Sequence, residues 1–226
     1  IPFGTYRWKV EKAGFTPLEV VISNDLPSSS TDLTTLPSRR LVLTLHRPDE
    51  VPKRMVRIPE GDLRQDRLFY GSGCVPAAPP FLIEKYEVTN RQYKAFVAHG
   101  GYEDARFWEH EFVRDGKTIP WSEAVDTFRD QTGRYGPSSW KSGTYPPRCA
   151  DFPVGGISWY EAAAFARFQG KALPTIYHWL QATGPRDHPY RIARFGNFGK
   201  GPLPVGRSRG MGQFGLYDAA GNVREW

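Results

Sequence analysis

Apolar and polar positions alternate in the first part of the chain. Tyr6, Trp8 and Val10 fall on one face of an extended segment, and polar side chains fall on the other. A period of two residues is typical of a half-buried β-strand. We therefore predict a strand at Thr5–Val10, followed by a turn at Gly14.

Two further apolar runs, Leu18–Ile22 and Arg40–Leu45, predict a second and a third strand. Between them lies Ser23–Ser38, a segment rich in serine, threonine and proline that favours turns. Together these segments predict a small all-β unit. The next stretch, His46–Arg54, carries prolines among charged residues, and we interpret it as a linker to a second domain.

Periodic apolar positions that follow a serine or threonine predict short helices in the second domain. Thr89 with Gln92 and Ser158 with Glu161 both have the spacing of a capping box, in which two residues satisfy each other's helix-end N–H groups. The first box precedes a buried stripe that ends at a glycine pair. The second precedes an alanine-rich run that ends at Gly170.

Similar signals predict one strand and two more helices. Met55–Gly61 is predicted as a short strand and turn. Ser122 is predicted to cap a helix that ends near Gly133, and Thr175 to cap the last helix. The fold class expected from this mixture of strands and short helices is α+β, with little regular secondary structure.

Composition supports a loop-rich fold. In 226 residues, aromatic side chains make up 14% and there are 23 glycines and 20 prolines, which favours an aromatic core with many loops over a helical bundle. We expect two domains, at residues 1–50 and 53–226. The net charge is +6, but acidic residues are interleaved with the basic ones, so no nucleic-acid partner is expected. No apolar run is long enough to span a bilayer, so no transmembrane segment is expected.

The cysteines and the chain ends add two expectations. Cys74 and Cys149 are too few for a disulfide framework, and whether they pair stays open because the sequence does not show whether their Cβ atoms meet. The chain begins without a start methionine or a signal-peptide core and stops directly after a motif, at Trp226. We expect a segment of a longer protein, with further domains linked on its amino-terminal side.

The stretch Phe214–Trp226 carries the candidate metal site. Asp218 and Glu225 are carboxylates seven positions apart, and Gly221 and Asn222 between them suit a tight turn that aims backbone carbonyls inward. Carboxylate and carbonyl oxygens are the ligands that calcium takes, and the lack of a nearby imidazole or thiolate argues against zinc. The alternative, a solvated turn aspartate and a surface glutamate, stays open.

A family resemblance rests on four blocks of sequence. GLYDAAGNVREW (Gly215–Trp226) resembles the GLYD-x-x-GNVWEW signature of the formylglycine-generating enzyme, or sulfatase-modifying factor, family. The other blocks stand in the family's order: Phe81–Tyr102, Pro153–Trp179 and Pro202–Arg207. The resemblance implies a variant of the C-type-lectin-like fold and a structural calcium ion. Its implied ligands are the side chains of Asp218 and Glu225 and the backbone carbonyls of Gly221 and Val223.

The resemblance also bears on catalysis. Oxidising members of the family use a cysteine pair, with copper, to convert a substrate cysteine to formylglycine, and that pair lies downstream of the signature. Cys74 and Cys149 lie upstream of it, so no catalytic residue is assigned. Copper is expected only if the chain continues into such a pair. An iron-dependent sulfoxide synthase is disfavoured because that branch needs an additional helical metal domain.

Two histidines and one loop are further candidates for functional sites, and none of them is predicted to bind a metal. The family commonly has LPTEAEW where this chain has LPTIYHW, so His178 stands where glutamate would complete a capping box, and we interpret it as structural. His110, in WEHEF, lacks the spacing that places two imidazoles on one helical face. In Arg194–Gly201, where relatives carry a second calcium loop, only Asn197 remains, so a second calcium site is expected to be absent.

These features lead to three functional expectations. The first is a lectin-like binding or sensory module that resembles versions following membrane-associated bacterial serine/threonine kinases, on the extracytoplasmic side, with an unknown protein or carbohydrate ligand. Ile1–Phe15 resembles part of a PEGA-like β-sandwich found beside such domains. The second is an oxidase whose cysteine tail lies beyond Trp226. The third is a diversified lectin-fold display scaffold. The residues after Trp226 would discriminate among the three.

Overall fold

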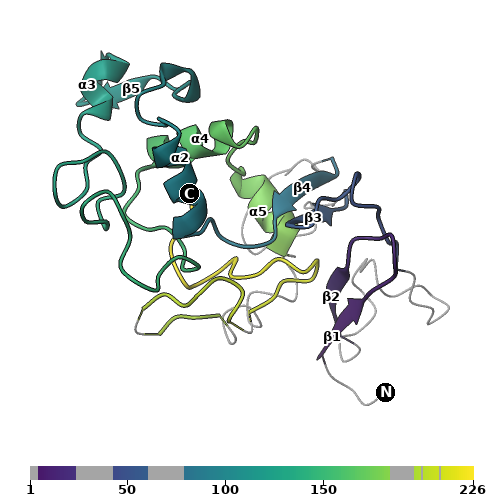
Figure 1. Ribbon diagram of the computed structural model, residues 1–226. Helices are drawn as coiled ribbons and strands as arrows, with labels where there is room; N and C mark the ends of the chain where they lie inside the picture. The colour runs from purple at the N-terminus through teal and green to yellow at the C-terminus, as the bar shows by residue number, and fades with distance from the viewer. Residues whose placement is uncertain (1–4, 24–42, 61–78, 184–195, 200, 209) are drawn as a thin grey trace. The chain divides into compact units, whose positions relative to one another are not determined.

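A computed structural model describes residues 5–23, 43–60, 79–183, 196–199, 201–208 and 210–226. They divide into two compact units. The first takes in residues 1–86, 175–198 and 208–221, and the second takes in residues 87–174, 199–207 and 222–226. Helices and strands are short, and the described strands form only two-stranded sheets, which confirms the expected low content of regular structure (Figure 1). Within the described ranges, no helix has the length and apolar character that a bilayer crossing requires.

The alternating segment of the first unit forms β1 (Thr5–Val10), as predicted. It pairs antiparallel with β2 (Leu18–Ser23), which confirms the second predicted strand. In this register Trp8 lies opposite Val20, and Val20 is buried whereas Trp8 is 37% exposed. The alternation therefore predicted the strand correctly, but Trp8, on the face that it predicts to be buried, is exposed.

A later segment of the first unit lies against β2. Val21 N donates to Gln213 O at 3.0 Å, and Tyr217 OH donates to Glu19 Oε2 at 2.9 Å. Gly215 has a φ of +86° and approaches Glu19 so closely that a Cβ would lie 2.5 Å from its carbonyl oxygen. A side chain at this position would push the two segments apart. The domain boundary predicted between residues 50 and 53 stays a prediction.

The predicted third strand, Arg40–Leu45, is wrong where the structure describes it. Leu43–Leu45 have no strand conformation, and the rest of the run lies outside the described residues, as does most of the predicted loop Ser23–Ser38. Next to this run, Thr16 N donates to His46 O at 2.8 Å, and the chain then turns. A single backbone hydrogen bond does not form a β-ladder, so the apolar run alone does not predict a strand here.

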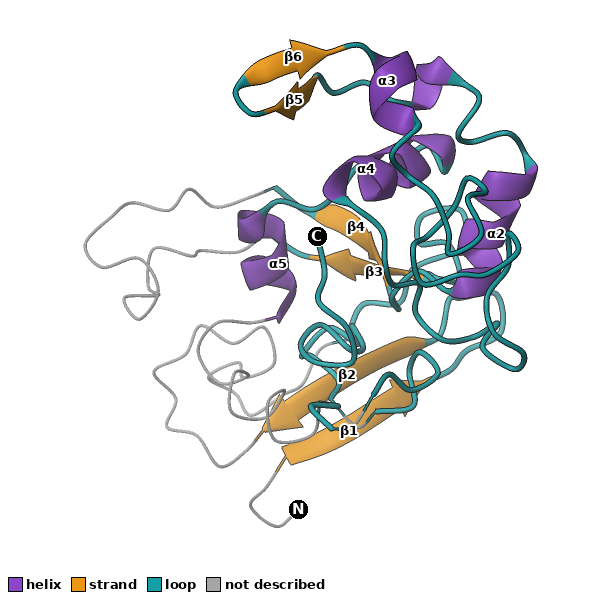
Figure 2. Cartoon of the chain, turned by 90° about the vertical axis from the view of Figure 1, so that its left-hand side faces the viewer, coloured by secondary structure: helices purple, strands orange, loops and turns teal. Residues whose placement is uncertain are grey.

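The first unit contains a second antiparallel pair, β3 (Met55–Ile58) and β4 (Phe81–Glu84), and one described helix, α5 (Ile176–Thr183) (Figure 2). β3 confirms the predicted strand, while Gly61, at the end of the predicted turn, lies outside the described residues. Four buried residues form a small core with these elements: Ile58, Ala182, Leu216 and Ala219.

Helix α5 begins with a cap in which histidine replaces the usual glutamate. Thr175 Oγ1 accepts from His178 N at 3.3 Å, and Thr175 N donates to His178 Nδ1 at 3.1 Å. The imidazole nitrogen thus does what a carboxylate oxygen does in a capping box. The ring also packs edge-on against Phe81, with centroids 4.6 Å apart. These contacts confirm Thr175 as the cap and give His178 the structural role that we predict for it.

The second unit carries the other elements. They are α2 (Asn90–Ala98), the 3-10 helix η2 (Ala105–Phe107), β5 (Phe112–Arg114), β6 (Lys117–Ile119), α3 (Trp121–Val125) and α4 (Trp159–Phe168). Both predicted capping boxes are confirmed, because the side chains of Thr89 and Gln92, and those of Ser158 and Glu161, bond each other's backbone N–H. Local sequence therefore sets the start of both long helices.

The prediction that Ser122 caps a helix is wrong. Helix α3 begins one residue earlier, at Trp121, with Pro120 as its first flanking residue and no side-chain cap. Pro120 O accepts from Glu123 N and Ala124 N, both at 3.1 Å. The fixed φ of proline suits the start of a helix, so the turn closes on its carbonyl. The helix also ends at Val125, well before the predicted stop at Gly133.

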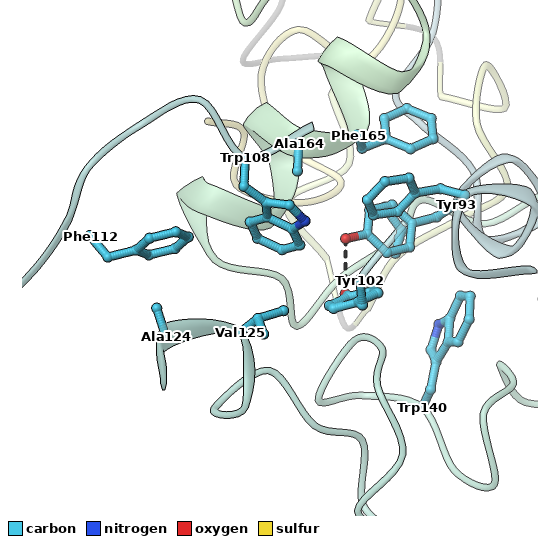
Figure 3. Packing of buried hydrophobic residues seen from close by; sticks show 11 residues of the cluster. Tyr93, Tyr102, Trp108, Phe112, Ala124, Val125, Trp140, Ala164 and Phe165 are labelled. Carbon is cyan, nitrogen blue, oxygen red and sulfur yellow. Dashed lines mark hydrogen bonds between the residues drawn. The ribbon is translucent and has the colours of Figure 1, made fainter. Parts of the chain in front are cut away.

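An aromatic core holds the second unit together (Figure 3). Tyr93, from α2, stacks on Phe165, from α4, with ring centroids 5.3 Å apart, and its hydroxyl lies 3.0 Å from that of Tyr102. The buried members of this core are Tyr93, Phe96, Tyr102, Trp108, Phe112, Ala124, Val125, Trp140, Val154, Ala164 and Phe165. The high aromatic content of the sequence is thus used to fix two short helices and the loops between them.

Asp130 organises the connection between α3 and α4. It is 6% exposed, and its Oδ1 accepts from the N and Oγ1 of Thr132 and from Arg134 N at 2.7, 2.8 and 3.1 Å. Its Oδ2 accepts from Gly143 N at 2.6 Å. Burial alone would raise the pKa of Asp130, but these hydrogen bonds outweigh it and lower the pKa to about 2. The carboxylate is therefore ionised, and it connects Thr132 and Arg134 to Gly143 within the loop of residues 126–143.

Replacing Asp130 with alanine is expected to lower the free energy of unfolding by about 3 kcal/mol, because four donors lose an ionised acceptor. The folded pKa lies below the unfolded value, so this contribution is present above about pH 4 and is lost as the pH falls towards about 2. Urea denaturation of both proteins should therefore show a smaller difference at about pH 2.5 than at pH 7. Asp151→Ala, which removes an exposed partner of Arg91, serves as the matched control, with an expected effect below about 1 kcal/mol. An equal Asp130 effect at both pH values would contradict this account.

Candidate metal loop

The first predicted ligand, Asp218, is a buried carboxylate in a tight loop of the first unit. It is 2% exposed and has a φ of +56°, an uncommon conformation for a residue other than glycine. Ser208 Oγ donates to Asp218 Oδ1, and Asp218 N donates to Gly210 O at 3.3 Å. The preceding turn is closed by Gly212 N donating to Leu216 O at 2.8 Å. The Ser208 hydroxyl thus holds the carboxylate, and the bond to Gly210 holds the backbone of Asp218.

The predicted turn at Gly221 and Asn222 is confirmed. Their φ values are +86° and +63°, both in the left-handed region. A Cβ at Gly221 would lie 2.8 Å from Asn197 O, so the position accepts only glycine without a shift of the backbone. A turn of this kind changes the direction in which successive carbonyl groups point, which is the property that an ion-binding loop requires.

Glu87 holds the part of the loop that belongs to the second unit. Its Oε2 accepts from Asn222 Nδ2 at 2.6 Å, and its Oε1 accepts from Val223 N at 3.3 Å. The Asn222 Oδ1 in turn accepts from Leu203 N at 2.7 Å. Sequence reasoning missed Glu87, and nothing in its local pattern marks it, because its partners lie more than 130 positions away.

The predicted ligands differ in environment. Asp218 and Gly221 belong to the first unit, and Val223 and Glu225 belong to the second, where Glu225 is exposed. The donor set consists only of hard oxygen atoms, which fits calcium. Among the residues that the structure describes, no group of three or more His, Cys, Asp or Glu side chains is placed to hold a metal. Any ion at this loop would therefore depend on backbone carbonyls as well as carboxylates, and calcium stays a prediction.

The other chemically reactive side chains have structural surroundings. Cys149 is free and partly buried, and its backbone carbonyl accepts from Asn90 Nδ2 at 2.9 Å. Cys74 lies outside the described residues. The His110 ring contacts the Trp159 ring at a tilt of 48°, with centroids 4.6 Å apart. In Arg194–Gly201, residues 194, 195 and 200 lie outside the described residues, so the expected absence of a second calcium site stays a prediction.

Comparison with known proteins gives a consistent family assignment. Residues 43–226 match the family described as "Sulfatase-modifying factor enzyme 1-like domain". The chain is 30% identical over 230 residues to a formylglycine-generating enzyme of Thermomonospora curvata, covering 84% of this chain and 76% of that protein. It is 30% identical over 173 residues to a hercynine oxygenase of Mycolicibacterium thermoresistibile, covering 66% of this chain and 35% of the oxygenase. It is 28% identical over 155 residues to the serine/threonine-protein kinase pkn1 of Chlamydia pneumoniae, covering 65% of this chain and 22% of the kinase.

Proposed function

The chain belongs to the sulfatase-modifying factor enzyme 1-like domain family, and we propose that within this family it is a calcium-stabilised, lectin-like binding or sensory module of a larger bacterial signalling protein. The observation that carries the proposal is the fraction of a relative's length that this chain matches. The match covers 22% of a serine/threonine kinase and 35% of an oxygenase. A domain that forms a minor part of proteins with different activities acts as a unit that is combined with others.

The kinase relative supports the signalling part of the proposal. In a kinase-linked protein the module would lie on the extracytoplasmic side and detect a protein or carbohydrate ligand. The β1–β2 hairpin would then be part of a PEGA-like β-sandwich, to which it would contribute two antiparallel strands. Signalling would follow from binding at the loops, which this fold presents on a rigid aromatic core.

Calcium is the second part of the proposal, with Asp218, Gly221, Val223 and Glu225 as its ligands. Three observations support it. Asp218 is a buried carboxylate in a left-handed backbone conformation, Gly221 and Asn222 form the turn that redirects the carbonyls, and the available donors are all oxygen. When bound, the ion would compensate the charge of Asp218 and join the loop to itself. This would stabilise the folded state by mass action.

A second candidate function is oxidation of a substrate cysteine to formylglycine. The similarity to the Thermomonospora curvata enzyme favours it, because the chain covers 76% of that protein, and members of the family can use copper. Copper(I) prefers converging thiolates. On this alternative the cysteine pair lies beyond Trp226, and the chain described here provides the scaffold. A diversified display scaffold is the third alternative, and the sequence after Trp226 again distinguishes it.

The experiment that separates module from oxidase uses the whole protein that contains this chain. It is loaded with copper under reducing conditions and incubated with oxygen and a cysteine-containing peptide, with the Thermomonospora curvata enzyme as the positive control. The module predicts that mass spectrometry finds the peptide thiol unchanged. A peptide aldehyde formed at a rate comparable with that of the control would overturn the module and establish the oxidase.

A further inference from the structure

A groove of about 490 Å³ opens on the surface of the second unit, between helix α2 and the loop organised by Asp130. Lys94 lines it from α2, and Arg129, Arg134, Tyr135 and Gly143 line it from the loop. Its volume lies in the range of small-ligand sites, which is roughly 300–1,000 Å³. No part of this groove coincides with the predicted calcium ligands.

The groove has more positive than negative charge. Its lining holds three cations, Lys94, Arg129 and Arg134, and one carboxylate, that of Glu103. Arg129 is already paired with Asp126, at 2.6 Å. Lys94 and Arg134 form no ion pair with any side chain in the described part of the chain. With Arg129 paired, Lys94 and Arg134 carry two positive charges against the one negative charge of Glu103, which leaves a net positive charge in the groove.

These two cations are held near each other by the same stretch of backbone. Lys94 Nζ donates to Gly143 O, and Arg134 NH1 donates to Ser142 O at 3.4 Å. Both bonds are to neutral carbonyl groups, so they position the charges without neutralising them. The remaining N–H groups of an ammonium and a guanidinium can still donate to an anion, the guanidinium through two parallel bonds.

The walls of the groove are rigid. The Asp130 carboxylate ties Thr132 and Arg134 to Gly143 through backbone N–H groups. Tyr135 stacks on Tyr102, with ring centroids 5.6 Å apart, and donates its hydroxyl hydrogen to Asp126 at 2.8 Å. Pre-organised donors lose little entropy when a ligand binds, which favours affinity.

We propose that this groove binds the oxyanion group of a small organic ligand, a phosphate or a carboxylate, through Lys94 and Arg134. Tyr135 does not provide a stacking platform for a sugar ring, because Tyr102 stacks on it and the Arg129 guanidinium lies 3.7 Å from its ring centroid. Recognition is therefore ionic rather than aromatic. The proposal goes beyond the module's general binding role and depends neither on calcium nor on linkage to a kinase.

The test is a calorimetric titration of the full 226-residue chain with inorganic phosphate and, separately, with citrate. Saturable binding of at least one probe is expected, and Lys94→Gln and Arg134→Gln should each weaken it about tenfold, because each removes one charge-assisted contact. Lys94→Arg keeps the charge and should keep the affinity within about threefold. Arg91→Gln is the matched control, since Arg91 also lies on α2 but pairs with Asp151 outside the groove, and it should leave affinity unchanged.

The two probes identify the source of the oxyanion: tighter binding of phosphate assigns a phosphate ligand, and tighter binding of citrate assigns a carboxylate. Circular dichroism of each variant verifies that it is folded. Absence of saturable binding by both probes would overturn the proposal. Binding that is unchanged in folded Lys94→Gln and Arg134→Gln proteins, or equally weakened in Arg91→Gln, would also overturn it.

Discussion

Replacing Trp140 with alanine is expected to lower the free energy of unfolding by about 4 kcal/mol, the largest effect of any single truncation that we predict. Trp140 is fully buried, and its ring packs edge-on against Tyr93, with centroids 6.1 Å apart. Its Nε1 donates to Asn90 Oδ1 at 2.8 Å. The substitution removes a large apolar surface, leaves a cavity, and deprives a buried amide oxygen of its donor.

The expected loss of stability in Trp140→Ala also includes contacts of Asn90, the hydrogen-bond partner of the indole. Asn90 begins helix α2, and its Nδ2 donates to the carbonyls of Cys149 and Phe152 at 2.9 and 3.3 Å. Trp140 therefore keeps Asn90 oriented for two loop contacts, so part of the expected loss comes from this chain of bonds. Urea denaturation followed by far-ultraviolet circular dichroism measures it without relying on tryptophan fluorescence.

Trp226→Ala is the matched control. Trp226 is 56% exposed, and its indole Nε1 donates to Ile157 O at 3.2 Å. Its truncation should cost less than about 1 kcal/mol, as for most surface substitutions. If the two tryptophan variants had equal midpoints, the buried aromatic core would not be the main source of stability in the second unit.

Glu161→Ala is expected to be as destabilising as Asp130→Ala, at about 3 kcal/mol at about pH 4. Glu161 is 3% exposed; its Oε1 accepts from Tyr102 OH at 2.6 Å, and its Oε2 accepts from Ser158 N at 2.7 Å. One residue thus completes a helix cap and satisfies the buried tyrosine pair. Alanine would leave the Tyr102 hydroxyl and the Ser158 N–H without these acceptors, whereas Glu161→Gln keeps a carbonyl oxygen and should cost clearly less.

Glu161 also predicts a pH dependence. Burial raises the pKa of Glu161, and it outweighs the hydrogen bonds from Ser158 and Tyr102, which lower the pKa. Because the folded pKa lies above the unfolded value, the group contributes stability below about pH 4.5 that is lost as the pH rises through the folded pKa. Glutamine does not titrate. The stability of Glu161→Gln relative to the natural protein should therefore be more favourable at pH 7 than at about pH 4, and the opposite trend would contradict the assignment.

Local signals in the sequence predicted most of the local structure. The capping boxes at Thr89 and Ser158 and the cap at Thr175 involve residues three positions apart, so they can be read without knowing the fold. The same is true of the turn at Gly221, where the residue types themselves favour positive φ. Helix starts and tight turns are therefore the features that the sequence predicts best.

Non-local contacts explain what the sequence did not predict. The run Leu43–Leu45 is apolar enough for a strand, but strand formation depends on a partner elsewhere in the chain. Glu87 holds Val223, and Ser208 holds Asp218, each through a contact made by the folded chain. The second acceptor role of Glu161, towards Tyr102, is hidden in the same way, because only its capping role has a local signature.

Thermal denaturation with and without calcium tests most directly the proposal that a divalent ion at the Asp218–Glu225 loop stabilises this fold. At a calcium concentration of about 100 times Kd, the ion should stabilise the natural chain by about 2.7 kcal/mol, which raises Tm by several degrees relative to chelated protein. Asp218→Ala should melt at a lower temperature and should not respond to calcium or to chelator. Superimposable melting curves of the natural chain with calcium and with chelator would contradict the claim.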